Sequence, residues 1–255
     1  MTALGRLPEG WRLEVHDRLP STNDEAIRLA RSGAPEGLTV WAQAQTAGRG
    51  SRGRSWDSPE GNLFASVVLR PEEPLRQAGQ IALLAAVALA EGVESLCPDL
   101  AVRCKWPNDL LLGGRKLGGL LVEGGGEGVP WLVLGFGLNV TLAPKKDDLR
   151  RSAVSLMESG CAATVPNVLA AGLRRLEAWL KLWRRAGFAP VRQAWMDRAW
   201  GLDAPTVVRY ANETLQGTFA GLDEDGALLL RYTSGHTRRI LGGDVEIDDT
   251  KPRRE

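Results

Sequence analysis

Histidine and cysteine are scarce in this chain of 255 residues. Its two histidines, His16 and His236, argue against a histidine-based catalytic triad or a multi-histidine metal centre. The three cysteines, Cys97, Cys104 and Cys161, are odd in number and show no CxxC spacing. This pattern predicts a reduced compartment, with neither a disulfide framework nor a cysteine zinc site.

Long apolar runs are lacking as well. The longest, residues 81–90, is far shorter than the roughly twenty residues that a bilayer span requires. Residues 1–10 show no charged-then-apolar signal pattern. The formal net charge of +1 gives no global attraction to a nucleic acid or a membrane surface. We therefore expect a cytoplasmic protein that has no membrane contact.

Lysine is rare beside arginine, at six residues against 26. Two of the six lie close together, Lys105 in the segment KWPND (105–109) and Lys116 in the segment RKLGG (115–119). Lysine supplies a compact, movable ammonium group, whereas arginine supplies a fixed planar fork. A turn accounts for the Pro-Asn-Asp of the first segment but not for the lysine and tryptophan before it, which favours a functional role.

Arginines gather in one glycine-rich loop, residues 45–56. Arg49, Arg52 and Arg54 are separated by glycines, and the loop ends at Trp56. Such a loop can surround anionic oxygens with charge and backbone N–H groups, and cover the ligand with an aromatic ring. Because its glycines are costly to order, we expect it to be mobile until an anionic ligand binds. Together with the lysine segments, it predicts an enzyme that activates a carboxylate with a nucleotide.

Two other interpretations of this loop are weaker. Residues 48–53 match the dinucleotide fingerprint G-x-G-x-x-G, but that fingerprint requires a helix directly behind it, and residues 56–61 have the composition of a turn. A disordered Arg-Gly segment that binds RNA is disfavoured, because the run is short, lies between expected strands and belongs to a near-neutral chain.

Apolar periodicity and short turns predict an α+β fold, with an antiparallel or mixed sheet and a central helix packed against it. The first helix should open at Thr22, in a capping box with Glu25, and stop at Gly33. Further helices are expected at residues 75–96, 166–187 and about 191–200. Strands are expected at residues 13–19, 38–45, 62–70, 101–106, 109–112, 116–123 and 131–140.

The character of the chain changes after Gly201. Short β-rich runs follow at residues 206–210, 214–221, 227–232 and 238–247, separated by turn residues. They predict a small all-β barrel in residues 201–255, ending in a charged tail at 248–255. The preceding residues, 1–200, would form a catalytic domain.

Further ligand-binding residues are expected at junctions and at strand glycines. Residues 21–23 (STN) serve either as a helix cap or as donors and acceptors for a small polar ligand, and both interpretations stay open. Glycines at 118, 119, 135 and 137 lie inside expected strands and permit a ligand or a backbone to approach closely. Asn139 can both donate to and accept from the edge of a heterocycle.

These segments, in this order, resemble the biotin protein ligase family over about residues 13–247. The resemblance is carried by the arginine loop, KWPND and RKLGG, and is supported by STN (21–23), GFGLN (135–139) and GGDV (242–245). It implies a catalytic domain similar to class II aminoacyl-tRNA synthetases, with a mixed or antiparallel sheet flanked by helices, followed by an SH3-like barrel. It also implies that biotin reacts with Mg-ATP to give biotinyl-5′-AMP, and that a lysine of the biotin carboxyl carrier protein then takes the acyl group and releases AMP.

The resemblance implies ATP and Mg²⁺ as cofactors and a role for each matching residue. The catalytic residues would be Lys116, Arg49 and Lys105. Biotin would be bound by Ser21, Thr22, Asn23, Gln45, Gly48, Arg49, Gly50, Ser51, Lys116, Gly118 and Gly119. ATP and the adenylate would be bound by Arg52, Arg54, Trp56, Lys105, Asn108 and Asn139. Asp109 would hold Mg²⁺ through water or orient the lysines, and both roles stay open.

Two features depart from the family pattern. The family's loop usually reads GRGRRGR, whereas Ser51 stands in the fourth place here, so a cation is missing and the adenylate should be held less tightly. Only about a dozen residues precede the first expected strand, too few for a DNA-binding module. We therefore expect a monomeric or homodimeric ligase that binds no DNA and has no repressor function.

The nearest alternative is a lipoate- or octanoate-protein ligase, which shares the broad fold but is not expected to combine this loop with KWPND. An alternative from another class is a nucleic-acid-binding module that uses the Arg-Gly loop. Steeply salt-dependent binding to DNA or RNA would mark that module.

Overall fold

The computed structural model describes residues 5–71, 74–125, 130–144, 152–210 and 212–248. Its larger elements, in chain order, are β1 (Arg12–Leu19), α1 (Thr22–Arg31), β2 (Leu38–Gln45), β3 (Leu63–Leu69), α2 (Pro74–Leu96), β4 (Val102–Lys105), β5 (Asp109–Leu112), β6 (Arg115–Gly125), β7 (Trp131–Leu138), α3 (Val165–Ala186), α4 (Ala189–Asp197), β8 (Pro205–Arg209), β9 (Thr214–Leu222), β10 (Leu228–Arg231), β11 (Thr237–Ile240) and β12 (Asp244–Ile247).

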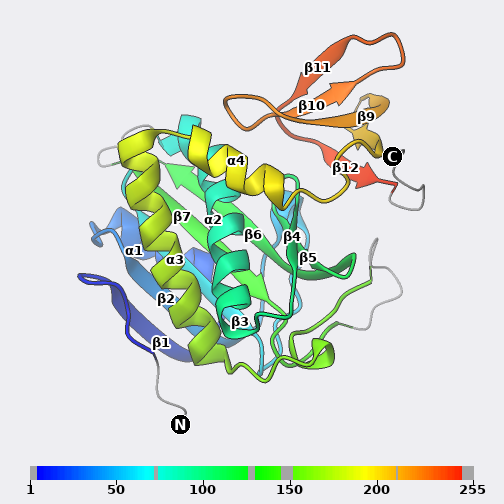
Figure 1. The fold of residues 1–255 in the computed structure, drawn as a ribbon. Helices are drawn as coiled ribbons and strands as arrows, with labels where there is room; N and C mark the ends of the chain where they lie inside the picture. Colours follow the sequence, from blue (N-terminus) through cyan, green and yellow to red (C-terminus); the bar gives the residue numbers. More distant parts are fainter. Residues whose placement is uncertain (1–4, 72–73, 126–129, 145–151, 211, 249–255) are drawn as a thin grey trace.

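Within the described ranges, strands β1 to β7 form one sheet in the order β1-β2-β3-β7-β6-β5-β4 (Figure 1). The pair β1 and β2 is parallel and every other neighbouring pair is antiparallel. The prediction of a mixed sheet flanked by helices is confirmed. Every residue of the central strands β3 and β7 is buried, as expected of strands covered on both faces.

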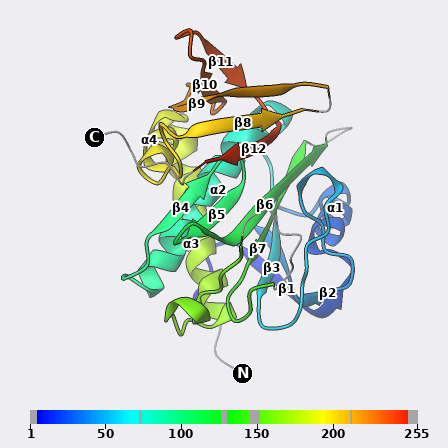
Figure 2. The ribbon, with the colours of Figure 1, turned by 90° about the vertical axis from the view of Figure 1, so that its right-hand side faces the viewer.

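Helix α1 covers one face of this sheet and α2 and α3 cover the other, while α4 packs against α2, α3 and β9 (Figure 2). The alternation of side chains along β7 divides the core accordingly. Val133 packs with α1 residues such as Ala26 and Ala30, whereas Leu132 and Leu134 belong to the larger core on the side of α2 and α3. Beyond the N-terminus of α1, no α-helix among the described residues covers this face, and most residues singled out from the sequence gather there.

The predicted cap of α1 was one residue out of place. Ser21, with extended backbone, is the N-cap, and its Oγ accepts the N–H of Asp24 at 3.4 Å. The hydroxyl of Thr22 instead donates to Gln45, and Glu25 binds Arg28 rather than the cap, so no capping box forms. Gly33 follows the helix at φ +88°, which agrees with the predicted stop.

The C-terminal strands form an antiparallel sheet in the order β11-β10-β9-β8-β12, counted over the described residues. The prediction of one continuous run at 238–247 is wrong, because Gly243, with φ +116°, ends the turn that separates β11 from β12. Nearly all of the predicted charged tail, residues 249–255, lies outside the described residues. Trp106 joins the two sheets, since its buried Nε1–H donates to the carbonyl of Gly226 at 3.1 Å.

Helix α2 is long and apolar enough, over Gln77–Leu96, to meet the length and composition of a membrane span. Its side chains from Ile81 to Ala90 are mostly buried between the sheet and α3. The helix is therefore the core helix of this fold, in agreement with its sequence-based interpretation as a buried segment.

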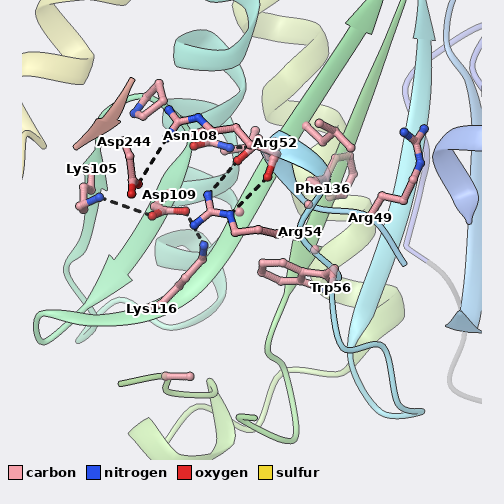
Figure 3. A pocket seen from close by; sticks show the side chains of 18 of the residues that line it. Arg49, Arg52, Arg54, Trp56, Lys105, Asn108, Asp109, Lys116, Phe136 and Asp244 are labelled. Atoms are coloured by element: carbon pink, nitrogen blue, oxygen red, sulfur yellow. Dashed lines mark hydrogen bonds and ion pairs between the residues drawn. The ribbon is translucent and has the colours of Figure 1, made fainter. Parts of the chain in front are cut away.

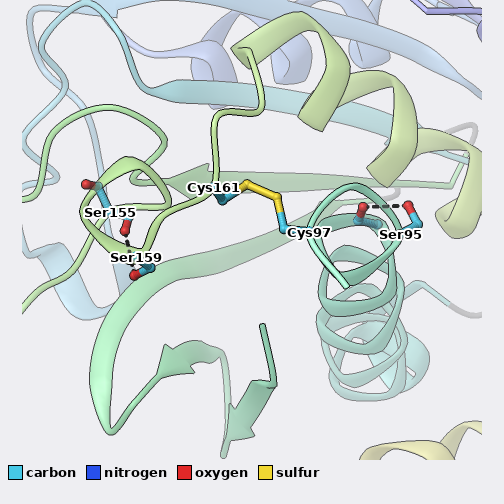
Figure 4. Close-up of a disulfide and its surroundings, with 6 residues drawn as sticks. Ser95, Cys97, Ser155, Ser159 and Cys161 are labelled. Atoms are coloured by element: carbon cyan, nitrogen blue, oxygen red, sulfur yellow. Dashed lines mark hydrogen bonds between the residues drawn. A yellow bond between two sulfur atoms is a disulfide. The ribbon is translucent and has the colours of Figure 1, made fainter. Parts of the chain in front are cut away.

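The prediction that the cysteines form no disulfide is wrong for two of the three. Cys97, just after α2, is bonded to Cys161, which follows the short 3₁₀ turn Met157–Ser159 (Figure 4). The residues are 64 positions apart, and no local spacing signals a pair that only tertiary packing brings together. Cys104 is free, and burial raises the pKa of its thiol to about 12, so it is held as an unreactive thiol.

Loss of the Cys97–Cys161 bond should destabilise the fold. Reduction, or replacement of both cysteines by serine, should lower the free energy of unfolding by about 4 kcal/mol, because a long loop is released in the unfolded chain. Calorimetry with and without reductant would measure this as a lower Tm. The double-serine variant is the control, since reductant should no longer change its Tm. A wild-type Tm that ignores reductant would contradict the assignment.

Candidate active site

One cavity of about 1020 Å³ lies on the α1 face of the sheet, and β12 of the C-terminal sheet closes one side of it (Figure 3). It brings together most residues predicted from the sequence. Those that line it are Ser21, Thr22, Asn23, Gln45, Arg49, Gly50, Ser51, Arg52, Arg54, Trp56, Lys105, Asn108, Asp109, Lys116, Gly119 and Asn139.

Two predicted residues, Gly48 and Gly118, are not part of this lining, and they serve close packing instead. A Cβ on Gly48 would lie 2.5 Å from the Oγ of Ser58, and one on Gly118 would lie 2.6 Å from the carbonyl oxygen of Gly137. Neither position tolerates a side chain without movement of its surroundings.

The end of the cavity at α1 is a dense hydrogen-bond network. Gln45 Oε1 accepts the backbone N–H of Thr22 at 2.8 Å and the hydroxyl of Thr22 at 3.2 Å. Ser66, buried on β3, donates to Asn23 Oδ1 at 2.6 Å. Ser21 therefore serves as the helix cap, and Thr22 and Asn23 line the cavity. Their role in binding a ligand stays a prediction.

Glycines on β6 and β7 make room for an aromatic ring. Cβ atoms on Gly119 and Gly137 would lie 3.3 Å and 2.6 Å from atoms of the Trp56 side chain. The Nε1 of Trp56 is buried and has no hydrogen-bond partner among the described residues. Lys116 Nζ lies 5.2 Å from the centre of the Trp56 ring, within the range of a cation–π contact. Tryptophan thus lies on a glycine surface beside a cavity lysine.

The arginine loop closes on itself. The N–H of Gly50 donates to the carbonyl of Arg54 at 2.7 Å, and the N–H of Trp56 donates to the carbonyl of Gly48 at 2.8 Å. At the tip, Arg52 adopts a left-handed backbone with φ +60°, which is strained for a residue with a side chain. The loop's mobility without ligand stays a prediction.

The three loop arginines reach different partners. Arg49 binds Glu123 and Asp24, Arg52 lies 3.3 Å from Asp244 on β12, and Arg54 donates to the carbonyl and the Oγ of Ser51 at 3.2 Å and 3.1 Å. In Figure 3 the guanidinium of Arg49 points away from the Lys116 and Asp109 side of the cavity. Cationic groups are therefore spread along the cavity.

Asp109 holds the two cavity lysines. Its carboxylate lies 2.6 Å from Lys116 Nζ and 3.7 Å from Lys105 Nζ. Burial alone would raise the pKa of Asp109, but the charges of Lys116 and Lys105 outweigh it and keep the pKa below its usual value. A charged carboxylate is thus retained in a partly buried place, and this geometry favours the lysine-orienting role among the two left open.

The two predicted asparagines are held by backbone groups. Asn108 Nδ2 donates to the carbonyl of Leu120 at 2.6 Å. Asn139 Nδ2 donates to the carbonyls of Lys116 and Val154 at 3.3 Å and 3.2 Å. These contacts fix the cavity wall, and the nucleotide-binding roles of both residues stay predictions.

Sequence reasoning missed four residues that shape the site: Asp24, Ser66, Glu123 and Asp244. Asp24 has the appearance of a first-turn helix acid, and Ser66 lies in an otherwise apolar strand. Glu123 and Asp244 come from distant strands and gave no local signal. Only the presence of Asp244 in the GGDV segment could have pointed to it.

A metal centre built by the protein does not fit the residues present. The described residues contain no group of three or more His, Cys, Asp or Glu side chains that could hold a metal ion. Asp109, a carboxylate of the cavity, is already paired with two lysines. A divalent cation would have to be held mainly by a substrate's own phosphates.

Spread cations, a glycine surface and a tryptophan ring define an enzyme site for an organic acid together with phosphate groups. The fold agrees with this class. The sequence model of the Biotin/lipoate A/B protein ligase family matches residues 17–197, and that of the Biotin protein ligase C terminal domain matches residues 202–248. The chain belongs to this family.

Individual relatives are similar over most of the chain. The biotin–[acetyl-CoA-carboxylase] ligase of Paracoccus denitrificans is 39% identical over 86% of this chain and 93% of its own. The bifunctional ligase/repressor BirA of Bacillus subtilis is 36% identical over 93% of this chain and 74% of its own. The structure of biotin protein ligase from Aquifex aeolicus in complex with biotin and ATP has a TM-score of 0.81 and 27% identity, covering 93% of this chain and 98% of that one.

The lowered pKa of Asp109 predicts a pH-dependent stability. A carboxyl whose pKa is lower in the folded state contributes stability above its unfolded pKa and loses it as pH falls through the folded pKa. The Tm gap between wild type and Asp109→Asn should therefore be largest near neutral pH and shrink below about pH 4. Asp203→Asn, which removes an exposed carboxylate paired with Arg231, should show little gap. A gap for Asp109→Asn that does not change with pH would refute this assignment.

Proposed function

We propose that this protein joins biotin to ATP as biotinyl-5′-AMP and transfers the biotinyl group to a lysine of the biotin carboxyl carrier protein. The observation that carries the proposal is the convergence of Lys116 and Lys105 on Asp109 in a cavity walled by Trp56 and the arginine loop. The relatives named above as biotin ligases, and the similar structure that holds biotin and ATP, support the same assignment.

The first step needs cations. A biotin carboxylate oxygen attacks the α-phosphorus, the bond to the bridging oxygen breaks and pyrophosphate leaves. Carboxylate and triphosphate repel each other, so preorganised positive groups lower the barrier. Lys116 is proposed to bridge the carboxylate and the α-phosphate, while Arg52, Arg54 and Lys105 neutralise other phosphate oxygens.

The second step needs an unprotonated amine from the carrier. Its nitrogen attacks the acyl carbon of the adenylate, the acyl–oxygen bond breaks and AMP leaves with its phosphate charge, while the nitrogen loses one proton to solvent. Trp56 is proposed to cover the adenylate and exclude water, and Asn139 to contact adenine. Like Trp56 and Asn139, Asn108 is proposed to bind the nucleotide. Magnesium is proposed to enter as Mg-ATP, because the described carboxylates do not form a metal centre of their own.

Biotin's ureido head is assigned to the α1 end of the cavity. Thr22, Asn23 and Gln45 present donors and acceptors there, next to the cap residue Ser21. The loop residues Arg49, Gly50 and Ser51 and the strand residue Gly119 would border the valeryl chain. Gly48 and Gly118 would act indirectly, through packing.

The remaining proposals concern organisation and partners. We assign residues 1–200 to a catalytic domain related to class II aminoacyl-tRNA synthetases and residues 201–255 to an SH3-like barrel with its tail. The protein would act in the cytoplasm as a monomer or homodimer, with the carrier protein as its macromolecular substrate. It would bind neither DNA nor membrane and have no repressor function.

The direct test is incubation with labelled biotin, Mg-ATP and a biotin carboxyl carrier domain, following label onto the carrier. A thermal-shift comparison of biotin, lipoate and octanoate, each with ATP, separates the related acyl ligases. Transfer of lipoate or octanoate in place of biotin would overturn the substrate. Salt-dependent binding to DNA or RNA without any biotin transfer would overturn the class of function.

Lys116→Ala should slow adenylate formation by on the order of 10²-fold, about 3 kcal/mol, as for loss of one preorganised transition-state donor. Pyrophosphate release measured in single turnovers would report it. Lys181→Ala is the matched control, since Lys181 is an exposed lysine of α3 paired with Glu177. Near wild-type adenylation in Lys116→Ala would remove its assigned role.

Ser51→Arg should retain biotinyl-AMP longer than the wild type, because it adds a cation beside the adenylate. Release of preformed labelled adenylate, followed by rapid filtration, measures the escape rate. Ser234→Arg adds the same charge in the exposed turn between β10 and β11, outside the cavity lining, and serves as the control. Equal escape rates for wild type and Ser51→Arg would show that Ser51 does not limit retention.

A further inference from the structure

Glu123, near the C-terminal end of β6, links three parts of the site without lining the cavity itself. Its carboxylate accepts two hydrogen bonds from Arg49, at 3.0 Å and 2.6 Å, and one from Asn23 Nδ2 at 2.8 Å. One strand residue thus connects the arginine loop to the first turn of α1. Its side chain is 28% exposed, so solvent screens these contacts only in part.

The pairing of Arg49 limits what that arginine can do for a substrate. Besides Glu123, it lies 2.7 Å from Asp24, so two carboxylates offset one guanidinium charge. Burial alone would lower the pKa of Arg49, but the hydrogen bond and charge of Glu123, with Asp24, raise it. Arg49 therefore stays protonated, but the two carboxylates already offset its positive charge. A substrate carboxylate gains little from it, whereas Lys116 lies on the other side of the cavity (Figure 3).

The same carboxylate fixes the orientation of Asn23. Ser66 donates to Asn23 Oδ1 at 2.6 Å, so the opposite atom, which donates to Glu123, must be the amide nitrogen. Gly135 leaves room for this arrangement, because a Cβ there would lie 2.0 Å from Asn23 Oδ1. With one N–H bound to Glu123, the second N–H of the amide is the group that Asn23 offers to a ligand carbonyl in the cavity.

We propose that Glu123 is a positioning residue for the organic-acid substrate, acting through Arg49 and Asn23. Arg49 then serves as a brace that holds the loop against the α1 end, and it is not the cation that meets the reacting carboxylate. This inference rests on the proposed function, because it takes the α1 end of the cavity as the seat of biotin's ureido head. It assigns Glu123 to binding of the acid and not to binding of the nucleotide.

The test is Glu123→Gln, which keeps the shape of the side chain and removes its charge. Calorimetric titration with biotin alone should give a Kd about tenfold higher than that of the wild type, since a charged hydrogen-bonded brace is weakened. The Kd of a non-hydrolysable ATP analogue should change by less than about twofold, and the Tm should stay close to that of the wild type. A merely structural role would weaken both ligands together with Tm.

Glu213→Gln is the matched control. It removes the charge from a similar two-bond Arg–Glu contact, with Arg238 in the C-terminal sheet, and should leave both dissociation constants unchanged. Arg49→Gln removes the Arg49–Glu123 contact from the arginine side and should raise the biotin Kd by a similar factor. The double variant should add little, because both changes remove one interaction.

The outcomes separate this inference from the function on which it rests. If the wild type binds no biotin, the proposed function fails before Glu123 is tested. If the wild type binds biotin and Glu123→Gln retains its Kd, only the positioning role fails. Should Glu123→Gln not fold, Arg49→Gln decides alone: an unchanged biotin Kd, or an equal loss for the ATP analogue, overturns the inference.

Discussion

The site depends on one partly buried carboxylate that keeps two ammonium groups beside each other. Without Asp109, Lys105 and Lys116 would repel, and neither would have a fixed place in a cavity meant for anions. Strand pairing makes this arrangement available, because Asp109 begins β5 directly opposite Lys105 at the end of β4 and Gly119 on β6. The register of the antiparallel sheet thus determines which charged side chains lie next to each other in the site.

Cations at the two ends of the cavity are managed differently. At one end, the lysines share a single carboxylate and keep a net positive charge for a substrate. At the other, Arg49 meets two carboxylates, so it contributes rigidity more than charge. Arg54 donates to two neutral oxygens of Ser51, and its charge helps to lower the pKa of Asp109. A glycine-rich loop with three similar side chains therefore carries out three different tasks.

Most of the fold was predictable, because the sequence patterns mark nearly every larger helix and strand to within a few residues, although they merge β11 and β12 into one run. The cavity was predictable too, since its residues come from compact motifs with unusual composition. What local pattern could not show are relations between distant segments. Three such contacts join residues far apart in the chain: the Cys97–Cys161 bond, the pair of Arg52 with Asp244, and the pair of Arg49 with Glu123. The shift of the α1 cap to Ser21 has a similar cause, since the Thr22 hydroxyl binds Gln45 across the site.

Trp106 answers a question that KWPND raises, namely why a tryptophan follows a cavity lysine. Its ring is buried and its Nε1–H reaches the carbonyl of Gly226 in the turn between β9 and β10. Trp106, which follows Lys105 directly, is thereby hydrogen-bonded to the C-terminal sheet. The C-terminal sheet consequently cannot be replaced without regard to this contact. A chimera that exchanges the C-terminal sheet with that of a distant homologue must bring a matching turn, or the backbone beside the lysine loses its anchor.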